Sequence, residues 1–316
     1  MTKPAILFTV TGWDPAPWVA AVRAADPDRP AFVWPDVPDP AAIAYALTWK
    51  PASGALNGLP NLRAIFSLGA GVDHLIFQGG LPEVPIVRVV DPDLTGRMTE
   101  WVVLQVLMHH RRQRLYDRQQ RERVWKERKQ VAAHAVRVGI MGMGVLGQAA
   151  ARALTGLGFR VAGWSRRGLS AASVESFGGT GTLDAFLART DILVCLLPLT
   201  AQTRGILAMP LLRKLARNGP PGMPVLINGG RGGLQVEADI IAALENGVLA
   251  GASLDVFERE PLEAASPLWV MDNVVITPHS AAASTPEALV PAMLKQIADL
   301  EAGGPLGNLV DRKAGY

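Results

Sequence analysis

The sequence predicts an α/β protein built from two doubly wound parallel sheets, and three observations support this prediction. Short apolar segments alternate with helix-like stretches and Pro/Gly turns along most of the 316 residues, a pattern typical of parallel sheets covered by helices. The alternation falls into two series, one before Met98 and one from Val136 onward. A Gly-x-Gly-x-x-Gly motif follows the first strand of the second series, at the start of a helix-like run.

Length and composition indicate a globular protein with two cores, because single cores stop growing at about 250 to 300 residues. No apolar run approaches about 18 residues, and the start MTKPAILFTV lacks the charged region and long apolar stretch of a secretory signal. We therefore expect a cytosolic protein with no membrane partner, and no bound metal. The single cysteine, Cys195, lies in an apolar run, so we expect it to fill the core rather than act as a nucleophile.

The first series contains apolar segments separated by helical stretches and turns. Strands are predicted at 6–10, 31–34, 44–48, 64–67 and 86–89. From Met98 to about Arg123 the pattern turns helical, and its first half, TEWVVLQVLMHH, is apolar on nearly every side. A helix of this kind must be buried, either between domains or against another subunit.

The second series predicts six strands in succession, which suits a doubly wound sheet. They lie at 136–141, 160–164, 192–196, 225–228, 250–254 and 274–276. A helix-like stretch at 286–302 follows them and can return to the first domain.

A glycine-rich turn follows the first strand of the second series. It reads Gly142-Met143-Gly144-Val145-Leu146-Gly147. The first glycine permits a tight turn, the second lets the backbone approach a pyrophosphate, and the third lets helix and strand pack closely. Amides at the helix start then face the phosphates. We assign these six residues to dinucleotide binding, with a plain βα turn as the alternative.

The end of the next predicted strand indicates which nucleotide is bound. An NAD-specific site usually has an acid there for the ribose diol, whereas this chain reads Ser165-Arg166-Arg167. A hydroxyl and two guanidinium groups can hold a 2′-phosphate through charge-assisted bonds. We therefore expect NADP(H) to be preferred over NAD(H). The alternative is an exposed turn that is basic by chance and binds no phosphate.

A basic run lies between the two series. Residues 111–129 contain nine Lys/Arg against three acids, in a chain with a formal net charge of +3. Such a run raises a nucleic-acid hypothesis. The interspersed acids, and apolar residues such as Val124 and Trp125, favour a solvated helix that packs on the protein. We therefore expect no nucleic-acid partner, and salt-sensitive retention on DNA would contradict this expectation.

Three segments that end or follow strands carry Arg231, Glu260 and His279, at positions where ligands collect on open α/β sheets. Reduction of a 2-keto acid needs a cation to hold the carboxylate and a proton donor for the developing alkoxide. The planar guanidinium of Arg231 can hold the carboxylate. His279 can donate the proton if Glu260 favours its imidazolium form and orients the ring. Singly, each has an ordinary alternative as a surface arginine, a solvated acid or a core histidine. Their joint appearance indicates a catalytic site.

Several motifs together resemble one family. They are Gly69-Ala-Gly-Val-Asp-His74, Met98-Thr-Glu-Trp-Val, the glycine turn, Pro198-Leu-Thr-Ala-Gln-Thr-Arg-Gly205, DVFEREPL from Asp255, and Thr277-Pro-His279. Over nearly its full length the chain resembles the D-isomer-specific 2-hydroxyacid dehydrogenases, most closely their glyoxylate/hydroxypyruvate reductase A group. The resemblance implies a Rossmann nucleotide-binding domain at 98–285, inserted into a flavodoxin-like substrate domain made of 1–97 and 286–316. It also implies NADPH-dependent reduction of glyoxylate or hydroxypyruvate to glycolate or D-glycerate, by a homodimer formed through the long helix.

The resemblance also implies roles for single residues. In the family, an arginine in a glycine-rich loop binds the substrate, and a glutamate before a proline pairs with the histidine. The glycine loop of this chain is residues 229–233, and these roles fall on Arg231, Glu260 and His279. Asp255 occupies the position that contacts the nicotinamide amide. Further cofactor contacts are expected from Leu197, Pro198, Thr203 and Gly229.

The substrate carboxylate is expected to bind the backbone amides of Ala70 and Gly71. Their turn resembles the family's carboxylate-binding turn, and close backbone approach to an anion suits glycine. Trp49 resembles a tryptophan that closes over small substrates in this group, although it can equally plug the domain junction. The family's acid after the second strand is missing here, which weakens the case for NAD as cofactor.

Two further functions stay open. The same fold can serve another 2-hydroxy acid or a formate-type oxidation, because pocket shape decides between them. A nucleotide-sensing binding protein is a different class of function, and the intact Arg231, Glu260 and His279 set argues against it, since a sensor needs no proton donor.

Overall fold

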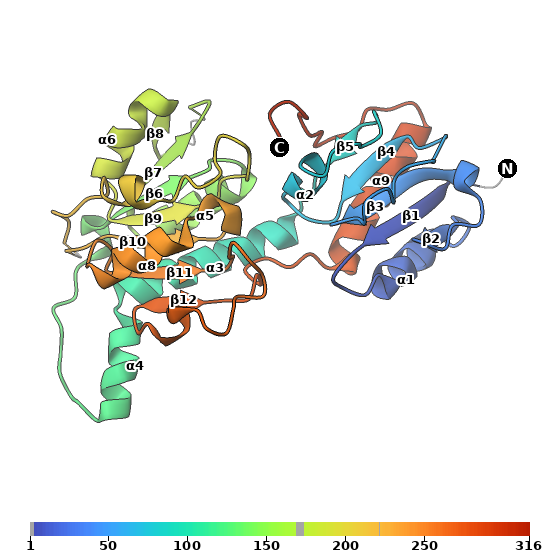
Figure 1. Cartoon of the computed structure of the whole chain (residues 1–316). Helices are drawn as coiled ribbons and strands as arrows, with labels where there is room; N and C mark the ends of the chain where they lie inside the picture. The colour runs from blue at the N-terminus through green and yellow to red at the C-terminus, as the bar shows by residue number, and fades with distance from the viewer. Residues whose placement is uncertain (1–2, 169–173, 221) are drawn as a thin grey trace. The chain divides into compact units, whose positions relative to one another are not determined.

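The computed structural model describes residues 3–168, 174–220 and 222–316. The chain divides into two compact units (Figure 1). Unit 1 consists of Met1–Leu94 and Ser284–Tyr316, and unit 2 consists of Thr95–Ala283. In the described ranges, none of the helices combines the length and apolar character needed to cross a bilayer.

Unit 1 is built on a five-stranded parallel sheet with the strand order β2-β1-β3-β4-β5. Its strands are β1 (Ala5–Val10), β2 (Ala31–Val33), β3 (Ile43–Trp49), β4 (Ala64–Ser67) and β5 (Ile86–Val87). Its helices are α1 (Ala16–Ala25), α2 (Asp73–Ile76) and α9 (Pro286–Glu301), with a 3-10 turn η1 (Pro40–Ala42). This strand order is that of flavodoxin-like sheets, so the predicted fold class is confirmed for this unit.

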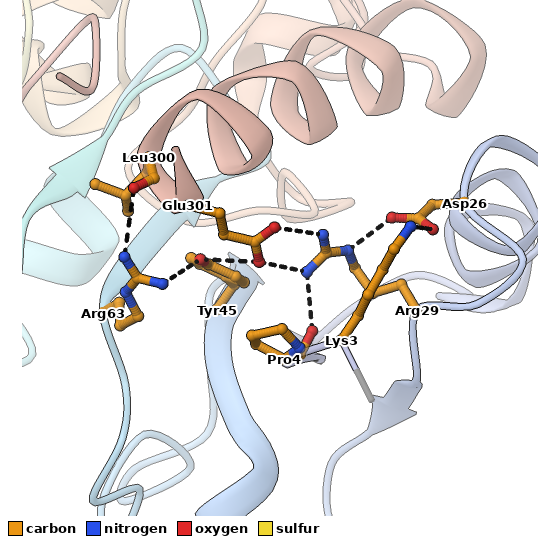
Figure 2. Close-up of polar contacts among 8 residues, drawn as sticks. All are labelled: Lys3, Pro4, Asp26, Arg29, Tyr45, Arg63, Leu300 and Glu301. Atoms are coloured by element: carbon orange, nitrogen blue, oxygen red, sulfur yellow. Dashed lines mark hydrogen bonds and ion pairs between the residues drawn. The ribbon is translucent and has the colours of Figure 1, made fainter. Parts of the chain in front are cut away.

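Residues from both ends of the chain meet at one edge of unit 1, where α9 ends beside the strand starts (Figure 2). The buried Arg29 guanidinium donates to both carboxylate oxygens of Glu301, at 2.9 and 3.0 Å. The hydroxyl of the fully buried Tyr45 donates to the same carboxylate at 3.2 Å, and accepts from Arg63. Removing Glu301 would leave the buried Arg29 guanidinium with fewer partners, and a buried charge without its partner is destabilising. The network therefore ties α9 to the first part of the chain.

Unit 2 is built on a seven-stranded parallel sheet with the strand order β12-β11-β10-β9-β6-β7-β8. Its strands are β6 (Arg137–Met141), β7 (Arg160–Ser165), β8 (Glu175–Gly178), β9 (Ile192–Cys195), β10 (Val225–Asn228), β11 (Gly251–Leu254) and β12 (Val274–Ile276). The helices are α3 (Pro92–His110, which begins in the last residues of unit 1), α4 (Gln113–Glu122), α5 (Val145–Gly156), α6 (Leu183–Ala188), α7 (Met209–Leu212) and α8 (Glu237–Glu245). Short 3-10 turns are η2 (Ala133–Ala135), η3 (Thr180–Thr182), η4 (Gly232–Leu234) and η5 (Pro267–Val270).

The order of the first six strands of this sheet is that of a Rossmann fold, with the direction of winding reversing between β6 and β9. Apolar clusters cover both faces of the sheet, as a parallel sheet requires. Cys195 lies fully buried in one of them, and burial raises the pKa of its thiol to about 12. A thiol of this kind stays protonated, as expected for a residue that fills the core.

Two local predictions were wrong. The strand β8 was missed, because its sequence ESFG is short and mostly polar and lies at the sheet edge. The single helix predicted from Met98 to about Arg123 is two helices, separated by Arg112 in the left-handed conformation (φ 55°). Leu104, in the first half of that stretch, is 54% exposed in the single chain, whereas Val102 and Val106 are buried, so burial of this residue against another subunit stays a prediction.

Candidate active site

The carboxyl ends of three neighbouring strands carry the candidate catalytic residues. Asn228, Leu254 and Ile276 end β10, β11 and β12 and are aligned in the sheet, since Asn228 pairs with Leu254 and Leu254 with Ile276. The loops that follow these strands therefore leave the sheet at the same edge. They contain Arg231, Glu260 and His279, respectively.

His279 and Glu260 are in direct contact. Nδ1 of His279 lies 2.8 Å from Oε2 of Glu260, and their side chains are 34% and 28% exposed. The other carboxylate oxygen, Oε1, accepts a hydrogen bond from the Phe257 amide at 3.2 Å. Because both oxygens are engaged, the carboxylate is oriented, and it fixes the imidazole ring. The opposite ring nitrogen, Nε2, is then the one that can exchange a proton with a ligand.

Asp255 holds the loop that presents His279. Its buried carboxylate accepts hydrogen bonds from the amides of Ser280 (2.9 Å) and Ala281 (3.1 Å) and from the Thr277 hydroxyl. Its carbonyl accepts from the His279 amide at 2.8 Å. His279 itself is left-handed (φ 53°), a conformation that persists in a non-glycine residue only where its surroundings fix it. Asp255 therefore positions His279, a role that the sequence did not reveal.

The glycine loop carrying Arg231 packs against the Glu260 loop. A Cβ built on Gly232 would overlap the Phe257 carbonyl and lie 2.8 Å from the Glu258 amide nitrogen. Only glycine permits this approach, and Arg231 is the residue directly before it. The half-buried Arg231 side chain donates from Nη1 to the Gly230 carbonyl at 2.9 Å. The loop thus brings Arg231 next to the segment that carries Glu260.

The three glycines of the turn after β6 differ in what surrounds them. Gly142 has φ 103°, and a Cβ there would lie 2.6 Å from the Leu196 carbonyl oxygen. A Cβ on Gly147 would overlap the Gly142 carbonyl, whereas one on Gly144, the N-cap of α5, would meet nothing within 4 Å. The first and third glycines are therefore needed for packing. The second leaves open space beside the amides that begin α5, which fits a pyrophosphate.

The side chains between these glycines have different surroundings. Met143 is buried, and its sulfur packs against Gly163 of β7, so only its backbone can face a nucleotide. Val145 is exposed, and Leu146 is half-buried against the core.

The end of β7 is held in a defined shape. The Ser165 carbonyl accepts hydrogen bonds from the amides of Gly168 (3.2 Å) and Gly179 (3.1 Å), and the Trp164 indole donates to the Gly179 carbonyl at 3.0 Å. Ser165 is nearly buried, whereas Arg166 and Arg167 are exposed. Two accessible guanidinium groups on a fixed turn fit a phosphate on the adenosine ribose.

Other expected cofactor residues lie near the end of β9 and in the glycine loop. The Thr203 hydroxyl donates to the Pro198 carbonyl at 2.7 Å and accepts from the Thr200 amide at 2.8 Å, so it shapes this loop. Leu197 is nearly buried. A Cβ on Gly229 would lie 2.9 Å from the Trp101 ring, so packing explains this glycine.

Three of the residues expected to contact the substrate lie in unit 1. Trp49 ends β3, and Ala70 and Gly71 lie in the turn after the neighbouring strand β4. All three are partly exposed. The same edge of this sheet therefore carries the indole and the turn.

The basic run lies largely on α4, which projects from unit 2, and on the segment that follows it (Figure 1). Arg118 pairs with Asp272 at 3.4 Å, and Arg114 donates to the Asp272 carbonyl. Trp125 is fully exposed, so it does not pack on its own chain as the sequence suggested. The absence of a nucleic-acid partner stays a prediction.

Comparisons with known proteins agree on one family. Residues 103–281 match the model for the NAD-binding domain of D-isomer specific 2-hydroxyacid dehydrogenases. The chain is 41% identical to the glyoxylate/hydroxypyruvate reductase A of Escherichia fergusonii, over 98% of this chain and 99% of that protein. It is 49% identical, with a TM-score of 0.95, to the NADPH-dependent glyoxylate/hydroxypyruvate reductase of Sinorhizobium meliloti solved with NADP and sulfate, covering 99% of this chain and 100% of that one.

A D-isomer specific 2-hydroxyacid dehydrogenase from Xanthobacter autotrophicus, solved with NADPH and MES, has a TM-score of 0.94 at 40% identity, covering 99% of this chain and 100% of that chain. The family model covers more than half of the chain, and these relatives match nearly all of it. The chain belongs to the family of D-isomer specific 2-hydroxyacid dehydrogenases.

Proposed function

We propose that this chain reduces a small 2-keto acid, glyoxylate or hydroxypyruvate, to the D-2-hydroxy acid with NADPH as the reductant. The observation that carries this proposal is the 2.8 Å contact between His279 and Glu260, at the carboxyl edge of the sheet that also carries the glycine turn. The names of the relatives from Escherichia fergusonii and Sinorhizobium meliloti support the substrate class.

Arg231, Glu260 and His279 divide the work at the reacting carbon. NADPH, held by the glycine turn and the Ser165 turn, would supply the hydride for reduction at C2 of the keto acid. Arg231 binds the substrate carboxylate and polarises the carbonyl, because its planar guanidinium can donate two parallel hydrogen bonds to a carboxylate. His279 gives a proton from Nε2 to the developing alkoxide, and Glu260 stabilises the imidazolium before that transfer.

NADP(H) is the cofactor that the exposed basic turn fits. The fixed Ser165 turn offers Arg166 and Arg167 to a 2′-phosphate. Structures of relatives solved with NADP or NADPH support this choice. The family position of Asp255 assigns it a contact with the nicotinamide amide, and its Oδ2 has capacity left for one.

Unit 1 serves as the substrate domain and unit 2 as the nucleotide domain. The turn containing Ala70 and Gly71 presents backbone amides to the substrate carboxylate, and Gly144 faces the pyrophosphate. The predicted cytosolic location stays a prediction.

The functional form is a homodimer associated through α3. Leu104 is 54% exposed on α3, and Leu107 and Met108 beside it on the same helix are half-buried, which leaves an apolar stripe in the single chain. A two-fold interface can bury the same stripe of both copies. Sedimentation or light scattering should give twice the mass of one chain, and Leu104→Glu should give the single-chain mass.

The test of the reaction follows NADPH absorbance with glyoxylate, hydroxypyruvate, pyruvate and phenylpyruvate. We expect turnover of the two small polar keto acids, and a loss of at least about a hundredfold in kcat for His279→Ala, as for removal of a general acid. The exposed His134 of unit 2 provides the control, and His134→Ala should keep full activity. Unchanged turnover in His279→Ala would rule out His279 as proton donor. NADPH binding without turnover of any keto or hydroxy acid would favour a nucleotide sensor.

A further inference from the structure

The Trp49 indole lies directly on the turn that follows β4. A Cβ built on Gly69 would overlap Cζ3 of Trp49 and would lie 2.9 Å from its Cε3 and 3.0 Å from its Cη2. The six-membered part of the indole therefore occupies the space that any side chain at position 69 would need. The glycine at this position is required by the indole.

Two further side chains contact the same indole. The ring centroids of Trp49 and His74 lie 4.7 Å apart, in a tilted arrangement with an interplanar angle of 55°. The Lys50 ammonium lies 5.7 Å from the centroid of the Trp49 ring, within the range of a cation–π contact. Gly69, His74 and Lys50 thus surround the indole, and all of them belong to unit 1.

The turn beneath the indole is held by its own hydrogen bonds. The Ser67 hydroxyl donates to the Gly69 carbonyl at 2.9 Å and is also 3.3 Å from the Gly69 amide. The Leu68 amide donates to the Thr48 carbonyl at 2.9 Å, which continues the pairing between β3 and β4. The indole and the turn are therefore parts of one packed structure within unit 1.

We propose that Gly69 and His74 are positioning residues that hold the Trp49 indole as a fixed wall beside the carboxylate-binding turn, and that this wall limits the size of the keto-acid side chain. The inference rests on the proposed function, because it takes Ala70 and Gly71 as the carboxylate-binding residues. It differs from a lid that closes only over substrate, since the indole is already in contact with the turn.

The dimensions of a small keto acid support this assignment. Consecutive Cα atoms lie about 3.8 Å apart, so a ring resting on Gly69 is one residue away from amides that hold the carboxylate. The group attached to C2 of a 2-keto acid begins two bonds from the carboxylate carbon. We therefore expect an indole held there to admit the hydrogen of glyoxylate or a hydroxymethyl group and to exclude a benzyl group.

The substrate test compares kcat/KM for glyoxylate with kcat/KM for phenylpyruvate. We expect His74→Ala to lower this ratio at least about tenfold, since one misplaced methylene in a pocket changes discrimination by about 10- to 200-fold. The change should appear in KM for both substrates, with kcat for glyoxylate altered less than about threefold. His74→Phe, which keeps an aromatic ring against the indole, should restore the ratio to within about threefold of the original.

A matched control removes a similar contact elsewhere. The rings of His110 and Phe159 in unit 2 lie 5.1 Å apart, and His110→Ala should leave the substrate ratio unchanged. Gly69→Ala should shift the ratio in the same direction as His74→Ala. If Gly69→Ala does not fold, the two His74 variants still decide the question.

A second measurement needs no turnover. The fluorescence of Trp49 is obtained by subtracting the emission of Trp49→Phe from that of the chain with Trp49 intact. Acrylamide should quench this fluorescence at least about twofold more strongly when His74 is replaced by alanine than in the native chain. Increased quenching with an unchanged substrate ratio would overturn the role in specificity, and unchanged quenching would overturn the positioning by His74. A native chain that reduces no keto acid would refute the proposed function and with it the role in specificity, while the quenching result would still decide whether His74 positions the indole.

Discussion

Acidification should destabilise unit 2 through His109, whose side chain lies in a groove beside the strand starts of this unit. Nε2 of His109 is 2.8 Å from the Ser253 hydroxyl. Burial, and then the charge of Arg114, lower the pKa of His109 from 6.5 to about 4. Below pH 6.5 the unfolded chain takes up a proton that the folded chain does not, so the free energy of unfolding falls as the pH drops, until it levels off below about pH 4.

The full shift corresponds to about 3 kcal/mol, at about 1.4 kcal/mol for each pH unit. Between pH 7 and pH 5 the loss from this one group should be about 2 kcal/mol, in a range where most carboxylates stay ionised. Urea unfolding at fixed protein concentration should show this loss in the native chain. In His109→Gln, which cannot titrate but can still bond Ser253, most of it should be absent.

An equal fall in the free energy of unfolding for both proteins between pH 7 and pH 5 would refute the reasoning. It would mean either that His109 is protonated in the folded state near its ordinary pKa, or that other groups dominate. A direct check is the chemical shift of the His109 ring protons, which should titrate near pH 4 in the folded chain.

Three substitutions near the site should have distinct effects. Gly232→Ala should lower kcat/KM at least about tenfold, because its Cβ would displace the Phe257 carbonyl and the loop carrying Glu260. The control Gly181→Ala, whose Cβ would have no atom within 4 Å, should keep full activity. Asp255→Asn replaces one oxygen of a buried carboxylate that accepts several hydrogen bonds with an amide nitrogen that cannot accept them. It should lower kcat at least about tenfold in the NADPH assay and reduce the free energy of unfolding by about 1 to 3 kcal/mol in urea titration. Arg167→Ala should raise KM for NADPH about tenfold and leave KM for NADH unchanged, since only the former carries a 2′-phosphate. Equal changes in both values would contradict that role.

The sequence predicted the fold class because its strands are apolar and regularly spaced, and because the glycine turn follows one of them. The order of strands and loops along the chain also predicted that Arg231, Glu260 and His279 follow strand ends. Their alignment comes from the sheet register, in which Asn228 pairs with Leu254.

Other features depend on contacts that residue types do not specify. The edge strand β8 is polar and exposed, so it lacks an alternating pattern. Arg112 adopts a left-handed conformation that arginine seldom favours. Asp255 reads as a nicotinamide ligand in the motif, yet its carboxylate holds the amides of Ser280 and Ala281. A hydrogen bond between loops 25 residues apart leaves no local signature in the chain.

The contact of Glu301 with Arg29 has a consequence for how the protein is made on the ribosome. Unit 2 is continuous in sequence and is complete once Ala283 has emerged, whereas unit 1 lacks α9 until the final residues are synthesised. The first 94 residues of a nascent chain therefore lack Glu301, one of the partners of Arg29, while the middle of the chain folds. A released fragment that ends at Ala283 should accordingly be digested by protease in its N-terminal part and protected in unit 2.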